Sequence, residues 1–276
     1  MTAKEWIKSQ LGVWQFNYEG RDVRDKTRHP ATFPISLAKK VIELFTHEGE
    51  LVLDPFVGSG TTLVAAQGLN RNAVGFDLQA DYVALCRERL AHDNLFNQAQ
   101  QIVVQDDALH SDCYLEPGTV KLVWTSPPYA NLLNRQRKNK SRGGDERKNE
   151  QFGKVEQYSQ HPRDLGTMPL AQYTQAMGDI FERLLPLLQP KGHCVINVPD
   201  MWWENQRITI HVALIDELRR RGYELRNIII WDRTNIVNRI GIFGWPSNYI
   251  TMGTTFEYLL DFWKPPDQVK AKGDSD

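Results

Sequence analysis

Two short motifs contain the residue types of a ligand-binding and catalytic site. The first is Asp54-Pro55-Phe56-Val57-Gly58-Ser59-Gly60-Thr61-Thr62, which stands between an expected strand and an expected helix. Small residues at such a turn let a ligand approach the backbone, and the helix N-terminus offers free N–H groups. Asp77 ends the next expected strand, where a carboxylate can accept hydrogen bonds from ribose hydroxyls. The pair predicts a site for a nucleoside-containing cofactor.

The glycine motif differs from two common nucleotide-binding patterns. No Gly-Lys-Ser/Thr follows Gly60, so a phosphate-binding loop is not indicated. Leu63 stands where a dinucleotide fingerprint has its third glycine, so a dinucleotide is disfavoured. A tight turn at Gly58–Gly60 and a helix cap at Asp77 are the purely structural alternatives.

The second motif, Thr125-Ser126-Pro127-Pro128-Tyr129, directly follows another expected strand. Two consecutive prolines remove two N–H donors, so the backbone there presents carbonyl oxygens. At the carboxyl edge of a sheet this makes an acceptor-rich pocket, which suits an amine substrate. The structural alternative is a rigid exit turn with Tyr129 packed on the core.

The motifs lie within alternating strands and helices. We expect strands at residues 50–54, 72–77, 102–105, 120–124, 193–198, 224–232 and 256–262. We expect helices at 35–45, 61–68, 82–90, 173–188 and 208–221, the fourth closed by Pro190-Lys191-Gly192. This alternation predicts an α/β fold with βαβ units and a parallel sheet. Residues 1–28 are expected to form an irregular arm.

Composition narrows the class of protein. The 276 residues are 41% hydrophobic and carry a net charge of −1, so global charge gives no sign of nucleic-acid binding. The three cysteines form no CxxC pair, and no apolar run reaches membrane-spanning length. We therefore expect a cytoplasmic protein without a membrane segment. His29, His161 and His193 lack metal-ligand spacing, so no metal is assigned.

A basic segment follows the second motif, within a stretch from about 130 to 170 that has no helical or strand period. Its cations are Arg135, Arg137, Lys138, Lys140, Arg142, Arg147 and Lys148. Alone, such a charge run is typical of a solvated disordered loop. Beside Tyr129 we interpret it instead as a segment that contacts phosphates and orders on binding.

Together the motifs resemble the amino-methylating DNA methyltransferases, which use S-adenosylmethionine (SAM). His29-Pro30-Ala31-Thr32-Phe33-Pro34 resembles the segment that precedes the glycine motif in this family. The resemblance covers about residues 28–265. It implies one domain over 1–276 with a Rossmann-like SAM-dependent methyltransferase fold, a mostly parallel seven-stranded sheet with helices on both faces. In many relatives the Pro-Pro-Tyr motif comes first, so this chain resembles a circularly permuted member.

The resemblance also implies residue roles. The implied cofactor-binding residues are Thr32, Phe33, Asp54, Pro55, Phe56, Gly58, Ser59, Gly60, Thr61, Thr62, Asp77, Asp106, Asp107 and Ala108. Which of the two adjacent aspartates contacts adenine stays open. The implied catalytic residues are Ser126, Pro127, Pro128 and Tyr129. The Ser126 hydroxyl and the Pro127 carbonyl would accept from the target amine, and Tyr129 would stack on the base.

The implied activity is site-specific methylation of cytosine N4 in double-stranded DNA, because the part Ser126-Pro127-Pro128-Tyr129 resembles the cytosine-N4 enzymes, whereas an acidic residue or Asn in place of the serine is commoner in adenine-N6 enzymes. The base must flip out of the duplex. The loops at about 130–170 and 233–255 are expected to read the DNA sequence, and the N-terminal arm and a second subunit stay open as further readers. Adenine N6, RNA or a protein amide stay open as targets, and a restriction endonuclease and a second copy of the chain stay open as partners. A catalytically silent nucleic-acid-binding module and a nicotinamide dehydrogenase are the alternatives from other classes.

Overall fold

The computed structural model describes residues 3–20, 22, 33–91, 98–129, 163–203, 206–236 and 254–266. The α-helices are α1 (Ala3–Ser9), α3 (Ile35–Phe45), α4 (Thr61–Gly68), α5 (Ala80–Ala91), α6 (Leu170–Leu184) and α7 (Ile210–Arg220), and the 3-10 helices are η1 (Ala108–Cys113) and η2 (Leu165–Thr167). The strands are β1 (Val13–Gln15), β2 (Leu51–Asp54), β3 (Asn72–Asp77), β4 (Gln101–Gln105), β5 (Val120–Thr125), β6 (Leu188–Val198), β7 (Met201–Trp203), β8 (Gln206–Ile208), β9 (Glu224–Asp232) and β10 (Phe256–Trp263).

The described residues form one central sheet of eight strands in the order β1-β9-β10-β6-β5-β2-β3-β4, and a separate β7-β8 pair. Strands β6, β5, β2, β3 and β4 run parallel to one another, and β10 is antiparallel to both β6 and β9. Strand β2 leads through α4 to β3 on one side, whereas β5 lies on its other side. Between β2 and β5 is therefore the topological switch point, where open α/β sheets bind ligands.

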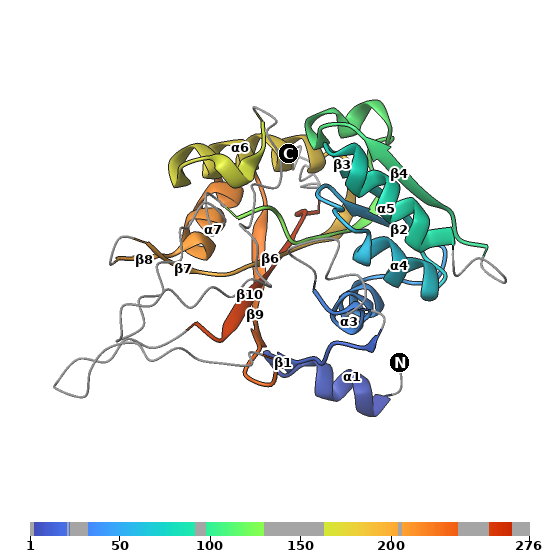
Figure 1. Cartoon of the computed structure of the whole chain (residues 1–276), viewed down its shortest axis with the longest axis horizontal. Coiled ribbons are helices and arrows are strands. Elements are labelled where there is room, and N and C mark those ends of the chain that lie inside the picture. Colours follow the sequence, from blue (N-terminus) through green and yellow to red (C-terminus); the bar gives the residue numbers. More distant parts are fainter. Residues whose placement is uncertain are drawn as a thin grey trace, which may run out of the picture.

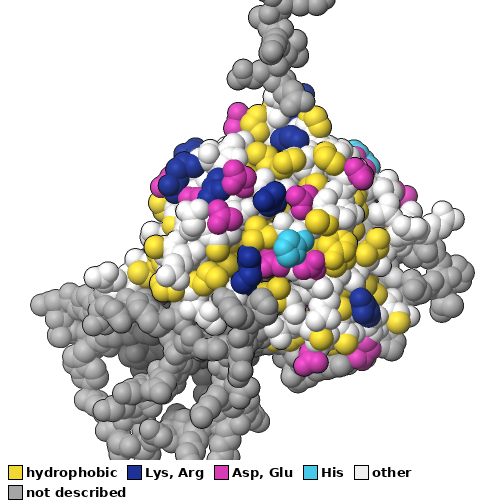
Figure 2. All heavy atoms as spheres, turned by 90° about the horizontal axis from the view of Figure 1, so that it is seen from above, with side chains coloured by type: hydrophobic (Ala, Val, Ile, Leu, Met, Phe, Trp, Pro, Cys, Tyr) yellow, Lys and Arg dark blue, Asp and Glu magenta, His cyan; other side chains and the backbone are white. Residues whose placement is uncertain are grey.

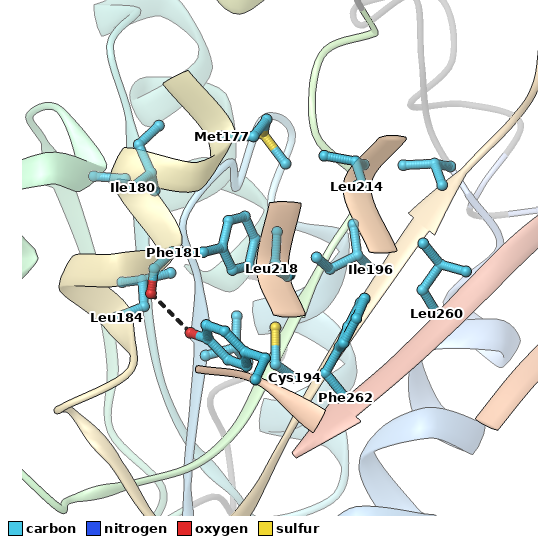
Figure 3. Packing of buried hydrophobic residues seen from close by; sticks show 14 of the residues in the cluster. Met177, Ile180, Phe181, Leu184, Cys194, Ile196, Leu214, Leu218, Leu260 and Phe262 are labelled. Atoms are coloured by element: carbon cyan, nitrogen blue, oxygen red, sulfur yellow. Dashed lines mark hydrogen bonds between the residues drawn. The ribbon is translucent and has the colours of Figure 1, made fainter. Parts of the chain in front are cut away.

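Helices cover both faces of this sheet (Figure 1). Alternate strand residues point to opposite layers: Val52 packs with α3, α4 and α5, whereas Leu53 packs with α6. Figure 3 shows the α6–α7 side, where Phe181 and Leu218 meet Ile196 of β6 and Phe262 of β10. The inner strands β2, β3 and β5 are buried on both faces, which explains their almost continuous apolar sequences.

Two sequence predictions about the elements are wrong. The sheet has eight strands, not seven, because residues 13–15 of the expected irregular arm pair in parallel with β9. A three-residue strand is too short to show a period, yet it buries Trp14 in the core. The fourth helix ends at Leu184, and residues 190–192 lie inside β6, not at a helix end. Lys191 has a φ of 61°, and the β5–β6 register shifts there, as at a β-bulge.

Within the described residues, no helix has the length and apolar character needed to cross a lipid bilayer.

Candidate active site

The two motifs meet at the switch point of the sheet. The glycine turn follows β2, and Ser126 to Tyr129 follow β5, its neighbour in the sheet. Both motifs line one cavity, with further residues from β3, η1, η2 and α6. The residues that line the cavity include Phe33, Phe56, Gly58, Ser59, Asp77, Leu78, Asp106, Asp107, Ala108, Ser126, Pro127, Pro128, Tyr129, Arg163, Leu165 and Ile180. The topology therefore joins residues that are about 70 positions apart in the sequence.

The glycine turn has a backbone that only glycine tolerates at its last position. Gly60 is the N-cap of α4 and has a φ of 84°, in the left-handed region. A Cβ added there would lie 2.3 Å from the Cys86 sulfur of α5. The turn thus packs directly on α5, and Thr61, the first residue of α4, lines the cavity.

Asp54 connects the two motifs by accepting hydrogen bonds from residues of both. Its carboxylate accepts hydrogen bonds from the hydroxyls of Thr62 (2.5 Å) and Thr125 (2.6 Å) and from the N–H of Phe56 (3.0 Å). Burial raises the pKa of Asp54 to about 6, although these hydrogen bonds lower it. Asp54, Gly60 and Thr62 do not line the cavity. Their hydrogen bonds and packing instead support the glycine turn.

Asp77 does line the cavity, at the end of β3. One of its oxygens accepts from the N–H of Gly58 (3.0 Å) and the other from the N–H of Gln79 (2.8 Å). Burial raises the pKa of Asp77 to about 6, against the effect of these two hydrogen bonds. The carboxylate therefore links the glycine turn to β3 and keeps acceptor capacity for hydroxyl groups in the cavity.

Asp106 and Asp107 both line the cavity after β4. Asp106 accepts from the Tyr114 hydroxyl (2.8 Å) and is 2.9 Å from the His110 Nδ1, and the His110 hydrogen bond lowers its pKa. Asp107 caps η1 through the N–H of Leu109 and forms an ion pair with Arg163 (2.7 Å). Each aspartate thus has its own structural partners, and Ala108, which directly follows Asp107, is buried in the apolar core.

The Pro-Pro-Tyr motif is held by hydrogen bonds from two more strands. The Ser126 Oγ lies 2.8 Å from the Tyr129 Oη. Asn197, at the end of β6, lies within hydrogen-bond distance of both hydroxyls. Glu257, at the start of β10, accepts from Asn197 and from Tyr129. These contacts place two hydroxyl groups and the Pro127 backbone at one wall of the cavity.

Sequence reasoning missed Asn197, Glu257 and the buried Arg89. The Nη1 of Arg89 donates to the Ser59 carbonyl (2.6 Å) and to the hydroxyls of Ser59 and Thr61, which clamps the glycine turn. A signal for Arg89 existed: it stands three residues after Cys86, on the apolar stripe of its helix, where a charge needs a partner. Asn197 and Glu257 come from strands whose pairing no local pattern reveals.

Several predicted residues lie outside the described residues: Thr32, the cations of the 135–148 segment, and most of the 233–255 loop. On the face drawn in Figure 2, basic and acidic side chains are interspersed with apolar ones. The predicted DNA contact at 135–148 therefore stays a prediction. Among the described residues, no cluster of three or more potential metal ligands occurs.

Comparison with known proteins supports the family resemblance over part of the chain. Residues 2–88, which include the glycine motif and Asp77, match the model of a family described as DNA methylase. The chain is 38% identical over 85 residues to the Type II methyltransferase M.HpaI of Haemophilus parainfluenzae, which is 31% of this chain and 26% of that protein. The chain spans about a quarter to a third of the length of the curated relatives it matches first. Over this part, the predicted relationship to the amino-methylating DNA methyltransferases is confirmed.

Solved structures show the fold over most of the chain. TrmN from Thermus thermophilus has a TM-score of 0.51 and 18% identity, and the match covers 85% of this chain and 50% of that one. A SAM-dependent methyltransferase from Methanosarcina mazei has a TM-score of 0.50 and 10% identity, with 82% and 98% covered. The chain therefore has the Rossmann-like fold of SAM-dependent methyltransferases, and the predicted fold class is confirmed apart from the strand number.

Proposed function

We propose that this chain is a SAM-dependent DNA methyltransferase that acts on the exocyclic N4 amine of a flipped cytosine. One observation carries the proposal: the glycine turn and the Pro-Pro-Tyr motif line the same cavity. The match of residues 2–88 to a DNA methylase family supports DNA as the substrate. The family uses SAM as its methyl donor.

The residues on the glycine-turn side fit SAM. Apolar walls from Phe56, Leu78 and Ala108 suit a purine ring, and Asp77 offers a carboxylate to ribose hydroxyls. Gly58 leaves the backbone open to a ligand at the start of α4. When bound, SAM supplies an electrophilic methyl group.

The residues on the other side fit a planar amine. The lone pair of an exocyclic amine is conjugated with the ring, so attack requires that it localise, and positive charge then develops on nitrogen. Acceptors aimed at that nitrogen stabilise this charge. Ser126 Oγ and the Pro127 carbonyl would accept the amine hydrogens, and Tyr129 would stack on the base. Fixed positioning supplies a further part of the rate, because nucleophile and methyl meet in one cavity.

Double-stranded DNA is the proposed partner, and the base enters the cavity only after it has flipped out of the duplex. The basic segment 135–148 is proposed to contact phosphates, and the loops at about 130–170 and 233–255 to read sequence. We further propose a role in restriction-modification, because a relative that matches the chain is named a Type II methyltransferase. A cognate endonuclease and a homodimer belong to this same proposal.

Nucleoside mass spectrometry after incubation with SAM tests the proposal. Unmethylated genomic DNA should gain N4-methylcytosine, and bulk tRNA and rRNA should gain no methyl group. N6-methyladenine would identify the adenine alternative, since the acceptor wall suits any planar amine. If RNA gains methyl groups and DNA does not, the assignment of DNA as the substrate is refuted. If no methyl group is transferred to any nucleic acid, the catalytically silent nucleic-acid-binding module is the function that remains.

A further inference from the structure

A chain of hydrogen bonds connects the Ser126 hydroxyl to a buried carboxylate outside the cavity. Ser126 follows β5, Asn197 lies near the end of β6, Glu257 lies at the start of β10, and Arg233 directly follows β9. These four strands are successive neighbours in the sheet. Because β10 is antiparallel to β6 and β9, its first residues lie at the edge where the other three strands end. The topology therefore gathers these side chains behind the Pro-Pro-Tyr wall.

Glu257 is the acceptor at the end of this chain. It is 5% exposed, and its Oε1 pairs with the guanidinium of Arg233. Its Oε2 accepts from the Asn197 Nδ2 at 2.6 Å and from the Tyr129 Oη at 3.4 Å. Arg233 in turn contacts Tyr18 of the N-terminal arm. A carboxylate paired with arginine has no hydrogen to donate, so every group that touches Glu257 must be a donor.

This requirement fixes the direction of each bond. The Tyr129 hydroxyl has one hydrogen, and it is directed to Glu257. The 2.8 Å contact between Ser126 Oγ and Tyr129 Oη could have either atom as donor. Since the Tyr129 hydrogen is already used, Ser126 must donate to Tyr129. Asn197 must present its Nδ2 and not its Oδ1 to the carboxylate, which leaves the second amide hydrogen for the hydroxyls, at 3.3 Å from Ser126 Oγ.

The hydrogen bonds that Ser126 can still make follow from a count of its hydroxyl hydrogen and lone pairs. A serine hydroxyl has one hydrogen and two lone pairs. The hydrogen goes to Tyr129, and one lone pair accepts from Asn197. One lone pair is left, and Ser126 lines the cavity. Toward a ligand, Ser126 is therefore an acceptor and not a donor.

We infer that Glu257 is a positioning residue that fixes the hydrogen-bond direction of Ser126, so that the cavity accepts an amine and disfavours a ring carbonyl. This inference rests on the proposed function, because it concerns the base that enters the cavity. An amine N–H meets the free lone pair of Ser126, whereas a carbonyl oxygen would face that lone pair. A neutral side chain at position 257 could donate to Tyr129, which would reverse the chain and direct the Ser126 hydrogen to the cavity.

The Glu257→Gln variant tests the inference, because glutamine keeps the shape and loses the acceptor-only character. The assay uses the full chain, tritiated SAM and unmethylated genomic DNA, with thermal unfolding as the folding check. We expect kcat to fall about tenfold or more, with SAM affinity and the KM for DNA within about twofold of wild type. An E257Q variant with wild-type kcat would overturn the inference.

Asp261→Asn is the matched control. Asp261 lies four residues further along β10, is fully buried, and accepts from His193 and Asn227, both at 2.7 Å. It does not line the cavity. D261N removes a buried charge from the same strand, and we expect less than about a twofold change in kcat, since a lost buried charge alone acts on stability. An equal loss of kcat in D261N and E257Q would mean a general structural effect and would overturn the inference.

A double-mutant cycle with Ser126→Ala separates positioning from general damage. Without the Ser126 hydroxyl there is no direction to fix, so S126A and S126A/E257Q should have equal kcat. A further loss in the double variant would contradict the inference. If E257Q does not fold, Tyr129→Phe breaks the same chain and leaves the Arg233–Glu257 pair intact. Y129F should also lose kcat with unchanged SAM affinity, and full activity would overturn the inference.

The proposed function and this inference fail in different ways. A folded wild-type chain that transfers no methyl group to nucleic acid refutes the proposed function, and with it the inference. A wild-type chain that methylates DNA while E257Q equals it refutes the inference alone.

Discussion

The Thr125 hydroxyl donates a 2.6 Å hydrogen bond to the Asp54 carboxylate, and this bond joins the last residues of β5 and β2. Asp54 introduces the glycine turn, and Thr125 introduces the Pro-Pro-Tyr motif. Both residues are buried, with exposures of 2% and 0%. The bond therefore fixes the distance between the cofactor side and the base side of the cavity.

Thr125→Val should weaken both folding and cofactor binding. Valine has nearly the same shape but leaves one Asp54 oxygen without its hydroxyl donor, which costs about 1–3 kcal/mol of unfolding free energy. SAM affinity should fall as well, because the two walls lose their connection. Denaturant unfolding and calorimetric titration with SAM measure the two effects.

Thr46→Val is the control for this change. The Thr46 hydroxyl is also buried and donates at 2.6 Å to the Ile42 carbonyl, at the end of α3. T46V should lower stability without changing SAM affinity. Equal losses of SAM affinity in T46V and T125V would show that the Asp54–Thr125 bond has no special role.

SAM affinity should decrease as the pH falls from 7.5 to 5. Burial raises the pKa of Asp77 to about 6, so this carboxylate takes up a proton within that range. Only the ionised form has both oxygens free of hydrogen for ribose hydroxyls. Calorimetric titration across the range measures the dependence, and Asp77→Asn should bind more weakly with a flatter profile. An identical pH profile in D77N would mean that another group is responsible.

Stability should fall as the pH rises from about 4 to about 6. The pKa of Asp54 is raised from 3.8 to about 6 by burial, so the folded state holds a proton that the unfolded state has lost. Its stabilising effect is complete below pH 3.8 and is lost as the pH rises through about 6. Asp54→Asn should reduce this slope in thermal unfolding, whereas Asn at the exposed Asp81 should leave it unchanged. A wild-type slope in D54N would contradict the assignment.

Arg89→Met should lower SAM affinity as well as stability, because the glycine turn loses donors to the Ser59 carbonyl and to two hydroxyls. Arg71→Met is the matched control. Arg71 also donates to backbone carbonyls, those of Leu69 and Thr46, but away from the cavity. R71M should destabilise the fold by a similar amount, about 1–3 kcal/mol, and leave SAM binding intact. An equal reduction of SAM affinity in R89M and R71M would contradict this prediction.

Sequence reasoning succeeded where consecutive residues alone determine an element or a motif. The bounds of α3, α4 and β9 agree with the predicted ranges, since amphipathic or buried runs end there at turn residues. The glycine turn and the Pro-Pro-Tyr motif each follow a strand as predicted, and the parallel topology then requires them to meet. Residues such as Phe56 and Asp77 were therefore within reach of the sequence.

The parts that sequence reasoning missed depend on contacts between distant segments. Strand β1 exists because β9 pairs with it, and β6 begins before Pro190 because a bulge absorbs residues 190–192. Asn197 and Glu257 become neighbours only because β10 inserts antiparallel between β6 and β9. Each of these features is fixed by strand order, which single-sequence periodicity does not contain.

The central claim is that residues 126–129 hold a flipped base against the methyl donor bound at the glycine turn. The most direct test is the rate of methyl transfer to DNA by a variant with both Pro127→Ala and Tyr129→Ala, beside a calorimetric measurement of its SAM affinity. We predict a loss of turnover of about a hundredfold or more with SAM binding retained, because the acceptor wall and the stacking ring are removed. Undiminished turnover in this variant would contradict the account.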